Sequence, residues 1–564
     1  MHPAPAAKSM VLAALEEELT RAQKILSQKG EPPPYLISYN ITETEFTVIN
    51  ASRGALETTN AGRSRMLDVD VRAGDYQLDN THRTGGPGGG GMGGQAIPVS
   101  IEDDAASIKS SLWMETDRRY RAAVERMMQI KTSQAIKVEE EDKSADLSRE
   151  TPQVSILPTA SLTLTSAQRD EWAKRARQWS ALFKKYPDIL DASVTFLAEA
   201  TNKFMANTEG TRLQHGTTHC RIAINARAKA EDGMDLNRFE TFDAVSPDRL
   251  PAETVVLAAI EQMAKDLIAL RNAPVIEPYT GPAILSGRAS GVFFHEIFGH
   301  RIEGHRQKDE DSGQTFTKQV NKPVLPAFIS VFDDPTLQKL KLPEGEVDLN
   351  GHYLFDDEGV KSQRVTVIEN GVLRNFLMSR SPIRGFPVSN GHGRRSPGLR
   401  PVGRQGNLLV ESSQKVSDAR LRELLVAECK SQNKPFGLFF SDISGGFTNT
   451  QRYGTQSFQV NPVMVYRVYT DGRPDELVRG VDLIGTPLVS FSKILATSDK
   501  VEIFNGICGA ESGWVPVAAI SPGILTQQIE VQKRPKSNER LPILPPPSQE
   551  GKQAAGIGEK KTGR

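Results

Sequence analysis

The segment "GVFFHEIFGHRIEGH", residues 291–305, places two histidines five positions apart, and this spacing limits the backbone that the segment can adopt. Residues four apart lie about 40° apart around a helix axis, whereas residues five apart lie about 140° apart. His295 and His300 therefore cannot reach one ion from a regular helix. Two local changes would align them: a π-bulge, which inserts one residue, or a loosening of the helix at Gly299.

The alternative interpretation is that these are ordinary polar residues on a surface helix. The frequencies of His and Glu predict on the order of 0.01 chance occurrences of the pattern in a chain of this length, which is a false-positive risk and no proof. The apolar "GVFF" ahead of His295 indicates that the helix enters a buried region, where a His–Glu pair needs partners. We therefore favour a metal site. Glu303 and His305 are further ligand candidates, although His305 would need a second distortion.

The composition is that of an ordinary globular protein, and it argues against several classes of function. Of 564 residues, 38% are hydrophobic and 24% are charged, and 69 basic residues balance 69 acidic ones. A net charge of zero argues against direct binding of nucleic acid. No apolar run approaches the ~18 residues of a membrane helix. The N-terminus lacks the features of a secretory signal, so we expect a cytoplasmic protein, unless the true start lies upstream.

Three scattered cysteines form no disulfide framework and no CxxC pair. Cys220, Cys429 and Cys508 suit a reducing compartment, and at least one of them is available for chemistry. This pattern agrees with the cytoplasmic expectation.

Hydrophobic periodicity predicts an α+β protein. Helices are expected over residues 9–29, 101–132, 166–185 and 251–271. The stretches around them alternate like antiparallel strands. After the histidine-containing helix the chain is mostly strand and loop, with hairpin turns at "ENG" and "TDG".

Composition shifts divide the chain into parts. We expect an N-terminal α/β-mixed domain with antiparallel strands over residues 1–275, a β-rich C-terminal domain over 276–535 and a disordered tail over 536–564. Within the first domain, residues 83–95 are expected to form a flexible Gly-rich loop and residues 133–160 a charged linker. The histidine-containing helix then lies near the domain boundary, where clefts commonly form.

The motif and its surroundings resemble the TldD/PmbA family of metalloproteases, once described as modulators of DNA gyrase. "HEIFGH" looks like the family's HExxxH signature. The family's third zinc ligand is a cysteine in a "G-x-C-G" setting before a "VPV" strand, and "FNGICGAESGWVPV" matches it at Cys508. "YRVYTDGRPDELVRGVDLIGTPL" and "SDISGGFTNT" also resemble the family's C-terminal domain. The clear resemblance covers roughly residues 190–530; the Gly-rich loop and the charged linker depart from it.

The resemblance implies that His295, His300 and Cys508 bind Zn²⁺. Catalytic zinc keeps three protein ligands and leaves a fourth position for water, whose pKa falls toward ~7. Glu296, beside the first ligand, is placed to take that water's proton and pass it to the leaving amine. Cys220 and Cys429 lack the "GxCG" setting and are interpreted as ordinary cysteines.

A long polar loop, "SNGHGRRSPGLRPVGRQGN" (389–407), follows the motif at a distance. One interpretation is a solvated surface loop. The other is a lid that orders over a bound peptide and contacts its carbonyls or its C-terminus. The second interpretation makes Arg394, Arg395, Arg400 and Arg404 substrate-binding residues. His352 and His392 have no ligand spacing and are expected to be structural or surface residues.

The leading functional hypothesis is a zinc peptidase that hydrolyses unstructured peptides or unfolded protein segments, with endo- or exopeptidase action left open. The resemblance implies a dimer, either a homodimer or a heterodimer with a TldD/PmbA-type chain, whose cavity admits extended peptides. A second hypothesis is a non-catalytic partner, since the PmbA (TldE) branch lacks the metal ligands that this chain has. A third is a regulatory binder of topoisomerase complexes, suggested only by the historical family name.

Overall fold

The computed structural model describes residues 6–83, 95–134, 142–308, 312–343, 345–451, 458–485 and 487–534. The predicted Gly-rich loop lies almost entirely outside the described residues, as do residues 135–141 of the predicted linker and the predicted tail. The fold is a mixture of helices and largely antiparallel sheets, so the predicted α+β class is confirmed.

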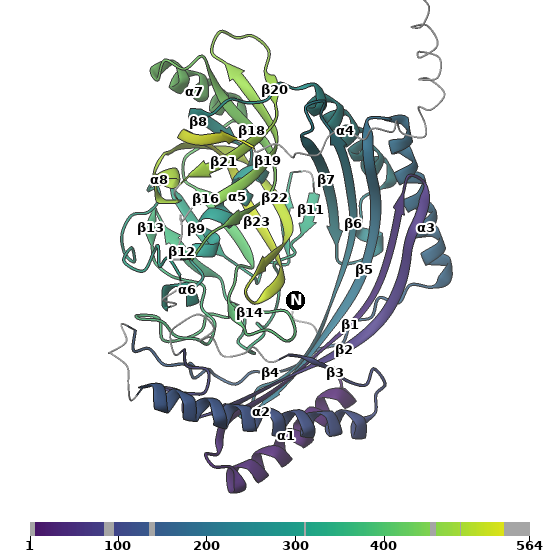
Figure 1. The fold of residues 1–564 in the computed structure, drawn as a ribbon, viewed down its shortest axis with the longest axis vertical. Helices are drawn as coiled ribbons and strands as arrows, with labels where there is room; N and C mark the ends of the chain where they lie inside the picture. Colours follow the sequence, from purple (N-terminus) through teal and green to yellow (C-terminus); the bar gives the residue numbers. More distant parts are fainter. Residues whose placement is uncertain are drawn as a thin grey trace, which may run out of the picture.

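A curved sheet of long strands forms the first half of the molecule (Figure 1). Its strands follow the order β3-β2-β1-β5-β6-β4, with β7 paired to β6, and the β4–β6 pair is parallel. The strands are β1 (Pro34–Ser52), β2 (Ala55–Ala73), β3 (Ile97–Pro98), β4 (Val154–Ile156), β5 (Ile189–Asn207), β6 (Arg212–Lys229) and β7 (Asp235–Ala244). Strand β4 comes from the predicted linker, whose C-terminal part is therefore built into this sheet.

Four helices cover this sheet, and the alternation of side chains along β1 shows that all four lie on one face of it. Ile37, Tyr39 and Ile41 pack with α1 and α2, and Ile49 and Ala51 pack with α3 and α4. All five residues have odd numbers within one strand, and alternate residues of a strand point to one face. The other face is left for the second half of the chain. The helices are α1 (Met10–Lys29), α2 (Ala105–Gln134), α3 (Ser166–Ala181) and α4 (Glu253–Asn272), each close to its predicted range.

The second half is a sheet of twelve strands built around β23 (Gly513–Lys533). This strand pairs with four others, β8, β16, β21 and β22. Because β8 also pairs with β18, the strands β23, β21, β19, β18 and β8 form a closed ring. These strands are β8 (Tyr279–Leu285), β16 (Asn407–Ser412), β18 (Phe436–Thr448), β19 (Phe458–Tyr469), β21 (Val481–Gly485) and β22 (Ile494–Ala510).

Shorter elements complete the second half. They are α5 (Gly287–Ile297), α6 (His305–Lys308), α7 (Asp418–Ser431), α8 (Pro487–Ser492), β9 (Ile329–Asp333), β10 (Lys339–Leu342), β11 (Gly345–Asp348), β12 (Val365–Glu369), β13 (Val372–Leu373), β14 (Gly393–Arg394), β15 (Val402–Gly403), β17 (Lys415–Val416) and β20 (Glu476–Val478). Asn370 and Gly371, both with positive φ, form the β12–β13 turn predicted at "ENG". Helix α5 lies inside this half (Figure 1). Its apolar side chains belong to the buried hydrophobic cluster of this half.

Ion pairs and one aromatic contact join the two halves. Arg380 donates to both carboxylate oxygens of Glu209, on the first half, at 2.6 and 2.7 Å. His215, on β6, lies against Phe355, with 6.0 Å between ring centroids. None of the helices in the described part of the chain combines the length and the apolar character needed to cross a lipid bilayer.

The buried imidazole of His215 makes the folded state sensitive to acid. Burial, reinforced by nearby Lys203, lowers its pKa from 6.5 to about 4. Above pH 6.5 His215 is neutral in both states; as the pH falls toward 4, the unfolded chain takes up a proton that the folded chain does not. One pKa unit corresponds to about 1.4 kcal/mol, so His215 should remove on the order of a few kcal/mol of stability across this range.

We expect His215→Phe, which can still stack on Phe355, to lose less stability than the wild type between pH 6.5 and pH 4. Urea denaturation at several pH values measures this difference. Parallel stability curves for the two proteins would show that His215 does not carry the effect.

Candidate metal centre

Helix α5 ends between the two histidines of the motif, and this resolves their five-residue spacing. A short 3-10 turn, Gly299–Arg301, follows directly after the helix. His295 lies in the last turn of α5, and His300 lies on the 3-10 turn. Of the two predicted distortions, the structure therefore has the loosening at Gly299 and not a π-bulge.

Gly299 packs directly against the buried side chain of Gln405. A Cβ atom at this position would lie 1.9 Å from Oε1 of Gln405. The Nε2 atom of Gln405 donates to the carbonyl oxygen of His295 at 3.3 Å. This contact fixes the end of α5 from the side, so the close approach, and not an unusual φ, requires glycine here.

His295, His300 and Cys508 come together in the protein interior. All three are buried, and their candidate ligand atoms lie within 4.8 Å of one another. The Nε2 atom of His300 is 3.3 Å from the Sγ atom of Cys508. Zn–N and Zn–S bonds of about 2.0 and 2.3 Å at a tetrahedral angle would separate such atoms by roughly 3.5 Å. The donor set and its spacing therefore fit a zinc ion.

The electrostatics of the cluster favour a thiolate at Cys508. Burial raises the pKa of a thiol, but His300 and His295 outweigh it and hold the pKa of Cys508 well below its ordinary value. In the same way, burial lowers the pKa of each imidazole, and the Cys508 thiolate outweighs this effect, so the pKa values of His295 and His300 are raised. The thiolate is the form of cysteine that binds metals.

The two further ligand candidates, Glu303 and His305, contact other protein groups. Glu303 accepts a hydrogen bond from Nδ1 of His300 at 3.1 Å, which leaves Nε2 of His300 facing the cluster. Burial raises the pKa of Glu303, but His300 and Arg306 outweigh it and lower the pKa to about 2. His305 is turned to Glu511, with which its Nε2 atom forms an ion pair. Neither residue belongs to the ligand group.

Glu296 lies beside the cluster, with its Oε2 atom 4.0 Å from Nε2 of His300. Gly446, on β18, packs against it: a Cβ atom at Gly446 would lie 2.9 Å from Cγ of Glu296. A carboxylate at this distance is close enough to exchange a proton with a molecule held between it and the cluster.

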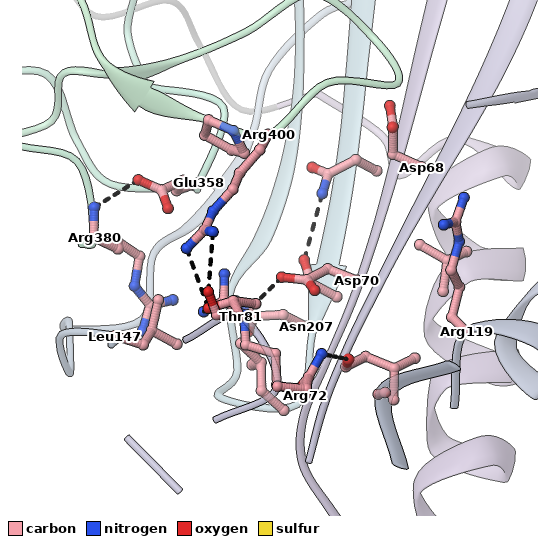
Figure 2. Close-up of a pocket in the computed structure, with 18 of the residues that line it drawn as sticks. Asp68, Asp70, Arg72, Thr81, Arg119, Leu147, Asn207, Glu358, Arg380 and Arg400 are labelled. Atoms are coloured by element: carbon pink, nitrogen blue, oxygen red, sulfur yellow. Dashed lines mark hydrogen bonds and ion pairs between the residues drawn. The ribbon is translucent and has the colours of Figure 1, made fainter. Parts of the chain in front are cut away.

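The loop 389–407 is neither a solvated surface loop nor a free segment. Arg394 and Arg404 are buried and donate to protein groups, Arg394 to the carbonyl oxygens of Gln405 and Pro516 at 2.8 Å. Arg395 pairs with Asp68, on β2, at 2.9 Å. Arg400 donates to Thr81, as Figure 2 shows. A substrate contact stays a prediction for all four arginines. Arg395 and Arg400 border a cavity, whereas Arg394 and Arg404 are buried.

His352 and His392 were expected to be structural or surface residues, and both make contacts within the protein. The Nε2 atom of His392 lies 3.1 Å from Oδ1 of Asp333, and both side chains are buried. The Nδ1 atom of His352 lies 2.8 Å from the carbonyl oxygen of Pro335.

The cavity bordered by Arg395 and Arg400 has a volume of about 450 Å³ and lies between the first sheet and the loop (Figure 2). Its lining carries charges of both signs, including Asp68, Arg72, Arg119, Glu358 and Arg400. The lining does not include His295, His300 or Cys508. The group of His295, His300 and Cys508 therefore lies outside this cavity, although the same loop borders both places.

Residues 278–533 match the family model described as the PmbA/TldA metallopeptidase C-terminal domain. A "Metalloprotease" of Archaeoglobus fulgidus is 27% identical over 275 residues, which cover 48% of this chain and 58% of that protein. A "Zinc metalloprotease TldD homolog" of Saccharolobus solfataricus is 26% identical over 252 residues, covering 44% and 51% of the two chains. The matched part thus spans about half the length of these relatives.

Solved structures share the fold over nearly the whole chain. A protein described as a modulator of DNA gyrase from Thermotoga maritima has a TM-score of 0.60 at 17% identity, covering 92% of this chain and all of that one. TldE from Thermococcus kodakarensis has a TM-score of 0.57 at 12% identity, again covering 92% and 100%. At these identities the likeness concerns the fold alone.

We expect Gly299→Ala to destabilise the protein, because the added methyl group must displace the buried side chain of Gln405. Overpacking of this kind typically costs about 1–3 kcal/mol. The double variant Gly299→Ala/Gln405→Ala removes the obstructing side chain and should recover part of this loss. Thermal unfolding of the three proteins measures both effects. A single variant as stable as the wild type would show that the contact does not restrict position 299.

Proposed function

We propose that this chain, a member of the TldD/PmbA family, is a zinc-dependent peptidase that hydrolyses unstructured peptides or unfolded protein segments. The observation that carries the proposal is the buried group of His295, His300 and Cys508 with the carboxylate of Glu296 beside it. The names of the relatives, which describe metalloproteases and in one case a zinc metalloprotease, agree with it.

His295, His300 and Cys508 would hold the zinc ion. When bound, zinc supplies a Lewis acid that polarises a scissile carbonyl group and makes a water molecule acidic near neutral pH. Two neutral imidazoles and one thiolate leave a net charge of about +1 on the bound ion, and three protein ligands leave one position open. The protein also stabilises the negative charge of the thiolate, because His300 and His295 hold the pKa of Cys508 well below its ordinary value.

Glu296 would act as the general base and then as the general acid. Its carboxylate takes a proton from the attacking water molecule and later delivers a proton to the leaving amine. It packs against Gly446 and is largely but not fully buried, with 13% of its side chain exposed. Such a carboxylate remains accessible to a small reactant while bulk water is restricted.

The burial of the site is evidence that the substrate is a flexible chain. The three ligands are each 7% exposed or less. They also lie between the ends of α5 and β22, two elements separated by about 200 residues of chain, so the site is enclosed by the fold. A folded domain presents no extended segment to such a site, whereas an unstructured peptide does. Arg395 and Arg400 are proposed to contact the peptide from the loop that borders the cavity.

A second candidate function is that of a non-catalytic partner in a TldD/PmbA-type complex. The likeness to TldE supports it, although only at the level of the fold. The ligand group argues for the catalytic role instead, since a non-catalytic chain has no need of it. We propose that the chain acts as a dimer, with itself or with a TldD/PmbA-type partner, inside the cytoplasm.

We expect about one zinc ion per chain in the wild type and much less in Cys508→Ala, because the variant lacks the one charged ligand. Elemental analysis of the purified proteins measures the content. Cys429→Ala, which removes a buried cysteine far from the cluster, is the matched control and should keep its zinc. Full zinc content in Cys508→Ala would remove Cys508 from the site.

We expect Glu296→Gln to keep the metal and the fold but to lose hydrolysis by about 10²-fold or more, the usual scale of general acid–base catalysis. An unstructured fluorogenic peptide serves as substrate, and a stably folded domain that contains the same sequence serves as the comparison. The wild type should cleave the peptide much faster. Equal activity of variant and wild type would contradict the role of Glu296, and equal cleavage of peptide and folded domain would contradict the substrate class.

A further inference from the structure

Arg404, on the loop 389–407, contacts the sulfur of Cys508. The Nη2 atom donates to Sγ of Cys508 at 3.2 Å and to the carbonyl oxygen of the same residue at 2.9 Å. The Nη1 atom donates to Ser512 Oγ at 2.8 Å and to the carbonyl oxygen of Gly513 at 3.1 Å. The guanidinium therefore holds both the sulfur and the turn that follows it, from Ala510 to Gly513.

Glu303 contacts the other side of the same guanidinium. Its Oε1 atom lies 3.4 Å from Nε of Arg404 and 3.1 Å from Nδ1 of His300. Its Oε2 atom accepts a hydrogen bond from Nε of Arg306 at 2.8 Å. Neither Glu303 nor Arg404 has any exposed side-chain surface.

Full burial of these two charges needs an explanation, since an ion without compensation in the interior costs several kcal/mol. The sulfur of Cys508 and the carboxylate of Glu303 both contact Arg404, and Arg306 supplies a second positive charge to Glu303. Arg306 also pairs with Glu511, on the β22–β23 turn, at 3.0 Å. Two arginines thus link the histidine-bearing segment to the cysteine-bearing hairpin.

We propose that Arg404 and Glu303 are positioning residues of the metal centre: Glu303 fixes the tautomer and orientation of His300, and Arg404 holds the Cys508 thiolate and weakens its donation to the metal. This inference rests on the proposed function, because it takes the cluster to be the zinc site. A carboxylate on the far nitrogen of a ligating histidine sets which nitrogen is free to bind the metal. A charge-assisted N–H···S hydrogen bond draws electron density away from the sulfur.

The experiment uses Co²⁺ in place of zinc, because a cobalt–thiolate bond gives a sulfur-to-metal charge-transfer band. The wild type should show this band. In Arg404→Gln the sulfur loses its charged donor, so the band should move to longer wavelength. The affinity for Co²⁺ should still fall by about 10- to 100-fold, the scale seen when such outer partners are removed, because Cys508 is no longer held in position and this loss outweighs the stronger donation by its sulfur. Arg404→Lys, which keeps the charge, should recover part of both effects. Glu303→Gln should lose affinity with little change in the band.

Arg394→Gln is the matched control. It removes a second buried arginine from the same loop, but Arg394 donates only to main-chain carbonyl oxygens. This variant should keep both the band and the affinity of the wild type. Circular dichroism checks that every variant is folded. If Arg404→Gln does not fold, the affinity of Glu303→Gln for Co²⁺ tests the proposal: a loss of affinity supports it and an unchanged affinity overturns it.

The failures of the two proposals can be told apart. A wild-type protein without the charge-transfer band would overturn the Cys508 metal site and this inference with it. A wild-type band that stays in place in Arg404→Gln, together with unchanged affinity in Glu303→Gln, would overturn the positioning role alone.

Discussion

The site depends on one unfavourable arrangement that the fold makes stable, namely a thiolate beside two imidazoles in the protein interior. A buried charge without partners would return to its neutral form. At Cys508 the two histidines and Arg404 provide the compensation, and they come from segments far from Cys508 in the sequence. Strand β23 brings these segments together, because it pairs with β22, which carries Cys508, with β8, which precedes α5, and with β16, which follows Arg404. The pairing around β23 is therefore a condition for the proposed chemistry and not only a support for it.

The register of the β22–β23 hairpin decides which side chain enters the cluster. Cys508 pairs with Val515 and is 6% exposed, whereas its neighbour Ile507 is 51% exposed on the opposite face. A slip of one residue would exchange the two faces. The hairpin turn is held from inside the protein by Arg404 and Arg306, so the contacts that compensate charge also oppose such a slip.

Local sequence was sufficient for the four helices of the first half and for the hairpin turn at Asn370, because each depends on residues close together in the chain. It also required a distortion between His295 and His300, but it left open whether this would be a π-bulge or a loosening at Gly299. It was not sufficient for Cys508, which was found through the resemblance to a family. The role of Arg404 had no local signal, since its partner lies 104 residues away. His305 shows the opposite limit. Its nearness to the motif in the sequence made it a ligand candidate, but Glu511, 206 residues away, pairs with it instead.

The family model and the structural likeness cover different lengths of the chain, and the different requirements of the two halves explain this. The family model covers residues 278–533, while the likeness to solved structures covers 92% of the chain. The first half needs only alternating apolar residues on long strands and matching helix faces, a pattern that tolerates extensive substitution when volume and periodicity are kept. The second half must also place specific donors within a few ångströms of one another around Cys508, and a site of this kind admits few alternatives. The family model therefore covers the half in which the metal chemistry is proposed, while the likeness in fold extends over most of the chain.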